Sequence, residues 1–147
     1  MMRFMVVMTA LLLPLGALAQ EPIGQLKTAS GSVTVTHGGA AKAAAAGDHV
    51  FQTDVVTTGA DGAVGITFID NSMMSLGPDS ELSLDQFQFN VTTHEGSFDS
   101  FLHKGTMAVT SGQIVQQQPE AMKVRTPTTL LGVRGTEFVV RASDNGK

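Results

Sequence analysis

The chain has 147 residues, enough for a single domain with one hydrophobic core. It contains no cysteine, which excludes disulfides, thiolate-based zinc sites and cysteine nucleophiles. The net charge is −4, and the sequence offers neither a basic stripe nor tryptophan or tyrosine for stacking, so we do not expect it to bind nucleic acid.

Residues 1–19 have the pattern of a secretory signal peptide. Arg3 supplies the positive charge, residues 4–15 are almost wholly apolar, and Ala17 and Ala19 are the small residues that a signal peptidase reads. The apolar run is shorter than the roughly 20 residues that a membrane-spanning helix needs. We therefore expect cleavage after Ala19 and one exported domain over residues 20–147, periplasmic or secreted, without a transmembrane segment. An uncleaved N-terminal anchor is the alternative.

The exported part begins with a pattern of strands and turns. Residues 32–36 alternate valine with serine or threonine, as a half-buried strand does, and residues 37–40 follow as a turn. The alanine-rich stretch 40–46 is too short to hold as an isolated helix, so we expect a loop or a weak edge strand there.

A regular series of short strands comes next, over residues 55–58, 63–69, 72–76 and 81–85. Acidic turn residues separate them at nine-residue intervals: Asp61, Asp70 and Asp79. Short strands at such a period predict an all-β fold, either an antiparallel meander, a short-stranded two-layer sandwich or a β-solenoid-like domain.

The alternation of apolar residues changes phase after this series. Leu82 and Leu84 occupy even positions, whereas Phe87 and Phe89 occupy odd ones. If both pairs face one core, a bulge or corner lies near residues 85–86.

The last third of the chain continues the β pattern. Residues 90–96 are a predicted loop, and apolar residues on both sides of Lys104 and Gly105 indicate further strands. The polar stretch 113–118 is compatible with a helical turn that ends before Pro119. Two closing strands are expected over residues 122–126 and 136–141, the second with Phe138 and Val140 facing inward.

Two blocks of this sequence resemble the FecR domain family. The first includes Thr58-Gly59-Ala60-Asp61-Gly62, the second spans residues 124–127 and 132–140, and the resemblance covers residues 25–141. It implies an all-β periplasmic module. In the best-known members this module follows a cytoplasmic segment and a membrane helix, and it relays a signal from an outer-membrane transporter to a sigma factor. This sequence shows neither of those segments, so we expect the module to carry over and not the circuit.

The resemblance also implies candidate binding residues, namely Gly132, Arg134, Gly135 and Thr136. Arg134 stands between two glycines near a predicted bend. Its guanidinium could tie strands together by donating to backbone carbonyls, or it could contact a ligand.

Metal binding has one candidate set in the sequence. Asp61, Asp70 and Asp79 could offer oxygens to Ca²⁺ if the strands stack in register. Aspartate is also a standard turn residue that accepts bonds from its own backbone. The four histidines have no metal-ligand spacing, and we expect no cofactor.

We expect no enzyme, because no serine lies in a G-x-S-x-G motif and no pair of carboxylates is singled out. The first hypothesis is a signal-sensing or interaction domain of the bacterial envelope that binds a protein partner. The alternative is a module that binds a glycan or a divalent metal, suggested by the acidic stretch 48–99, which lacks lysine and arginine. A third possibility is a structural component of an envelope assembly.

Overall fold

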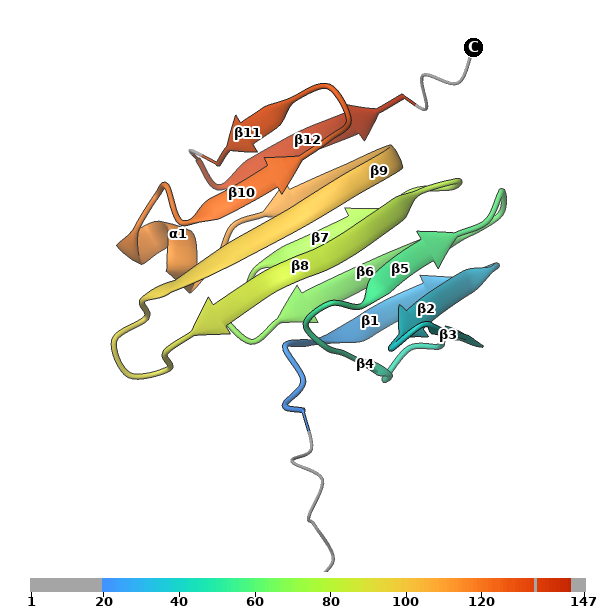
Figure 1. The fold of residues 1–147 in the computed structure, drawn as a ribbon, viewed down its shortest axis with the longest axis horizontal. Helices are drawn as coiled ribbons and strands as arrows, with labels where there is room; N and C mark the ends of the chain where they lie inside the picture. The colour runs from blue at the N-terminus through green and yellow to red at the C-terminus, as the bar shows by residue number, and fades with distance from the viewer. Residues whose placement is uncertain (1–19, 134, 144–147) are drawn as a thin grey trace, which may run out of the picture.

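The computed structural model describes residues 20–133 and 135–143, and its strands curl into an antiparallel half-barrel (Figure 1). The elements in chain order are β1 (Gly24–Ser30), β2 (Val33–His37), β3 (Ala40–Ala43), β4 (His49–Val50), β5 (Val55–Thr58), β6 (Ala63–Phe68), β7 (Met73–Leu76), β8 (Glu81–Phe89), β9 (Gly96–Thr110), α1 (Gln113–Gln117), β10 (Met122–Arg125), β11 (Leu130–Gly132) and β12 (Glu137–Ala142). The all-β class is confirmed. The sandwich and solenoid alternatives are not.

One continuous hydrogen-bonded ladder joins the strands in the order β3-β2-β5-β8-β9-β7-β6-β1-β4. β9 is its central member. The first part of β9 pairs with β8 and β10, and the second part pairs with β7 and β12. The β10–β9 pair is parallel, whereas the other pairs among the described residues are antiparallel.

Gly105 explains why β9 is one strand of 15 residues and not the separate strands expected from the sequence. Its φ of 97° lies in the left-handed region, which glycine adopts without a steric penalty. Leu102 is buried before this point and Met107 after it, so the inward face changes from even to odd positions. The glycine shifts the phase of the strand without ending its pairing.

The predicted bulge is present in β8. The register with β9 shifts between Leu84 and Gln86, and both Leu84 and Phe87 are buried as a result. Phe87 then packs edge-to-face on Phe98 with ring centroids 4.9 Å apart. Such an aromatic contact adds to the stability gained from burial alone.

Other predictions agree with the structure at the level of elements. The alanine-rich stretch forms β3, an edge strand, and the polar stretch after Gly112 forms α1. In β12, Val140 is buried and Phe138 is partly buried against the core. β1, β4 and β11 were not predicted. In the part of the chain that the structure describes, no helix has the length and apolar character needed to cross a membrane.

Candidate functional site

The first block of the family resemblance builds a corner where turns meet. Thr58 Oγ1 donates to the Gly77 carbonyl at 2.6 Å and accepts from Ser80 N at 2.9 Å. Gly59 N donates to the Ser32 carbonyl at 2.9 Å. These contacts are internal to the fold, so the block serves to hold strands in place.

The three candidate calcium ligands have separate surroundings. Asp61 Oδ1 accepts from Ser32 N at 3.2 Å, Asp70 is fully buried, and Asp79 is an exposed turn residue with a φ of 53°. Within residues 20–133 and 135–143, no three histidine, aspartate or glutamate side chains gather as a metal site would require. Asp61 and Asp70 therefore act in the way that turn aspartates do.

Asp70 also fixes the start of α1. Its carboxylate accepts from Ser72 N at 3.0 Å and Ser72 Oγ at 2.6 Å, and from Ile114 N at 3.4 Å. Its carbonyl accepts from Gln113 N at 2.8 Å. A side chain at Gly112 would place Cβ 2.3 Å from that carbonyl oxygen, so only glycine permits this approach. One buried aspartate thus joins the β6–β7 turn to the helix.

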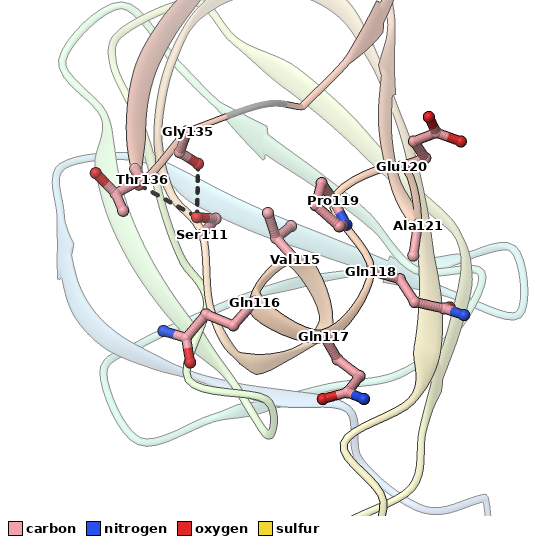
Figure 2. Close-up of a pocket in the computed structure, with 10 residues that line it drawn as sticks. All are labelled: Ser111, Val115, Gln116, Gln117, Gln118, Pro119, Glu120, Ala121, Gly135 and Thr136. Atoms are coloured by element: carbon pink, nitrogen blue, oxygen red, sulfur yellow. Dashed lines mark hydrogen bonds between the residues drawn. The ribbon is translucent and has the colours of Figure 1, made fainter.

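Directly before the helix, Ser111 ties the start of α1 to the segment that enters β12. Ser111 Oγ donates to the Gly135 carbonyl at 2.8 Å, and Ser111 N donates to the Thr136 carbonyl at the same distance. Figure 2 shows the hydroxyl of Ser111 directed at the carbonyls of Gly135 and Thr136, beside a groove of about 930 Å³. The residues that line it are Ser111, Val115, Gln116, Gln117, Gln118, Pro119, Glu120, Ala121, Gly135 and Thr136.

The groove combines apolar and amide surfaces. Val115, which is buried, contributes apolar surface together with Pro119 and Ala121, and three consecutive glutamines at 116–118 line it as well. Glu120 is the one charged residue among those that line it. Glutamine side chains both donate and accept hydrogen bonds, as backbone amides do. The groove is therefore suited to a segment that offers both apolar side chains and amide groups.

The structure brings together part of the predicted binding set. Gly135 and Thr136 line the groove, and Gly132 pairs with Lys123 in the β10–β11 hairpin. Arg134 lies outside the described residues. The sequence predicts a helical turn over residues 113–118, but it does not identify the glutamines as lining residues, because Gly135 and Thr136, which complete the groove, are distant in the chain.

A second arginine acts as a tie between strands. Arg125 in β10 donates from Nε to Asp99 Oδ1 at 2.9 Å and from Nη2 to Asp85. Its guanidinium lies 5.2 Å from the ring centroid of Phe101. The pKa of Arg125 is raised, chiefly by the hydrogen bond to Asp99, although partial burial opposes the shift. Arg125 belongs to the second block, so that block contributes a structural arginine.

Two polar pairs outside the groove resemble parts of catalytic sites. Ser83 Oγ lies 2.6 Å from His103 Nε2, but the ring centroids of His103 and Phe101 are 4.4 Å apart and, within residues 20–133 and 135–143, the imidazole of His103 bonds no carboxylate. His37 bonds the buried carboxylate of Asp54 without a hydroxyl nucleophile. Among the residues that the structure describes, neither pair has the three-part arrangement of an activated nucleophile.

Comparison with known proteins identifies a family. The family model described as FecR protein matches residues 54–147, more than half of the chain. The match begins later than the resemblance at residue 25 and extends to the last residue. No curated protein and no solved structure matches the chain. With its signature residues building the turns of a curled β-sheet, the chain belongs to the FecR protein family, a family related to signal transduction.

Proposed function

We propose that this chain is an exported, non-enzymatic module of the bacterial envelope that senses or relays a signal by binding a protein partner. Membership in the FecR family supports the signalling role. The pattern of residues 1–19 supports export through a cleavable signal peptide. The alternative of a glycan- or metal-binding module has less support, because Asp61 and Asp70 are engaged within separate turns.

The groove beside α1 is the surface that carries the proposal. Its volume of about 930 Å³ lies within the range of roughly 300–1,000 Å³ that is typical of binding pockets. Its apolar surface offers burial and its glutamines offer pairing to main-chain N–H and C=O groups. An extended segment of a partner protein has both kinds of group.

A comparative affinity capture from envelope extract tests the groove. Gln117→Arg places a cation in the groove and Thr136→Trp fills it, and both residues are exposed, so the fold should persist. Gln88→Arg is the matched control, since Gln88 is an exposed glutamine of β8 that does not line the groove. We expect the wild type and the control to retain the same protein in stoichiometric amount. Both groove variants should lose it.

The recovery of one identical set of proteins by all four forms would refute the groove as the partner site. Export is tested separately by expressing the whole chain and fractionating the cells. The mature protein should appear outside the cytoplasm with Gln20 as its first residue, determined by mass spectrometry. Recovery of the full-length chain in the cytoplasm would contradict the localisation.

A further inference from the structure

β12 is an edge strand with one partner. It pairs with β9 from Glu137 opposite Thr110 to Ala142 opposite Gly105, and among residues 20–133 and 135–143 no other strand pairs with it. Of the strands at the margins of the sheet, β12 has six residues, whereas β3 has four, β11 three and β4 two. β12 is therefore the longest row of backbone groups that another strand could extend.

The pairing with β9 decides which backbone groups face outward. Ser111 N donates to the Thr136 carbonyl, and this bond continues the β9–β12 register by one residue. In an antiparallel pair, alternate residues direct both N–H and C=O to the neighbouring strand. Even-numbered residues of β12 therefore bond β9, and the backbone groups of Glu137, Val139 and Arg141 point away from it.

The same three residues carry exposed side chains on one face. Val139 is 69 % exposed, and Glu137 and Arg141 are exposed on either side of it, whereas Val140 and Ala142 are buried. An acid and a base thus stand two positions before and two positions after an exposed valine. When a second copy of the strand is rotated by 180° about an axis through Val139, the acid of each copy lies opposite the base of the other.

We propose that β12 pairs antiparallel with β12 of a second copy of this chain, across a two-fold axis at Val139. In this register Val139 faces its own counterpart. Glu137 faces Arg141 of the second copy, and the symmetry repeats that pair. Unlike charges directly opposite each other stabilise an antiparallel pair, whereas like charges destabilise it.

Other registers match less well. A shift by two residues in either direction places Val139 opposite Glu137 or Arg141 and removes both charge pairs. A shift by one residue would require even-numbered residues, whose backbone groups already bond β9. Edges that resist association present repelling charges to their own copies. Here the charges attract, so the edge is suited to pairing.

The absence of cysteine makes a direct test possible. Val139→Cys should form a disulfide-linked dimer under mild oxidation, because Cα atoms in a hydrogen-bonded antiparallel pair lie about 5.5 Å apart, within disulfide range. Ala108→Cys is the matched control: Ala108 is exposed and lies opposite Val139 in β9. Its counterparts would be separated by three strand spacings, about 14 Å, and should not cross-link.

Two further measurements fix the register and the charge pairing. Glu137→Cys and Arg141→Cys should cross-link when mixed, and neither should do so alone. In sedimentation velocity, Glu137→Arg or Arg141→Glu should lower the dimer fraction, and the two together should restore it. Far-ultraviolet circular dichroism checks that each variant folds.

Two results together would overturn the proposal. The wild-type chain would stay monomeric in sedimentation velocity as its concentration is raised, and Val139→Cys would cross-link no faster than Ala108→Cys. Cross-linking of Glu137→Cys with itself would also overturn it, because it reports another register. Gln117→Arg should leave the dimer unchanged. Dimerisation can therefore fail or succeed independently of the partner site in the groove.

Discussion

Replacement of Asp70 should weaken both the fold and the position of α1. Its fully buried carboxylate accepts from Ser72 N at 3.0 Å and Ser72 Oγ at 2.6 Å, and Ile114 N lies at 3.4 Å. Asp70→Ala removes the acceptor and leaves these donors without a partner in the interior. Because this carboxylate bonds both the β6–β7 turn and α1, its removal should also disturb the helix that lines the groove.

The structure sets the size of the effect. Hydrogen bonds to charged groups contribute about 1.5–3 kcal/mol each, so the two bonds from Ser72 lead us to expect a loss of about 3–6 kcal/mol. Small domains are stable by only about 5–15 kcal/mol, so this loss is severe. Asp70→Asn keeps one acceptor oxygen and should cost about 1–3 kcal/mol.

Urea unfolding followed by far-ultraviolet circular dichroism is the appropriate assay, because the chain has no tryptophan or tyrosine to report by fluorescence. Asp79→Asn is the matched control, since Asp79 is exposed with a φ of 53°, which asparagine tolerates. We expect it to change stability by less than about 0.5 kcal/mol. Equal stability of Asp70→Asn and Asp79→Asn would refute the role assigned to Asp70.

Three other substitutions have expected outcomes in the same assay. Ser100→Ala should be neutral or stabilise by up to about 1 kcal/mol, because the buried Ser100 Oγ has no hydrogen-bond partner among the described residues; a loss above that size would contradict this. Gly105→Ala should cost more than about 3 kcal/mol or prevent folding, since Cβ would lie 2.0 Å from Ser80 Oγ at a positive φ; a folded variant of normal stability would show the corner to be adaptable. Arg125→Ala should cost less than about 1 kcal/mol, and the cost should shrink with added salt, because Arg125 and its carboxylate partners are about a third or more exposed. The raised pKa of Arg125 means that its contribution is complete at neutral pH and is lost only as pH rises far into the alkaline range, so a loss of that contribution between pH 6 and 8 would contradict the assignment.

Local patterns of apolar and polar residues predicted much of the sheet, because they depend only on which face of a strand is buried. Alternation identifies a strand that buries one face, and residues 64, 66 and 68 are buried as this pattern requires. The phase slip between Leu84 and Phe87 was sufficient to locate the bulge. These features depend on neighbours in the chain, which the sequence displays directly.

The features that the sequence did not predict depend on contacts between distant parts of the chain. The sequence predicts separate strands on either side of Gly105, whereas the structure has this glycine inside β9, packed against Ser80, where it shifts the phase of the strand. The parallel pairing of β10 with β9 has no local signal. The groove likewise forms because Ser111 meets Gly135 across 24 positions, a contact that neither segment predicts alone.

The two blocks of the family resemblance therefore have different physical roles. In the first, Gly62 has no room for a side chain, because Cβ would lie 2.3 Å from the Ser32 carbonyl oxygen. In the second, Thr136 and Val139 are exposed beside a groove and along a free edge. A change at Gly62 should alter whether the domain folds, whereas a change at Thr136 or Val139 can alter what the domain binds while the sheet persists. Partner recognition in this chain should consequently be sought between α1 and β12.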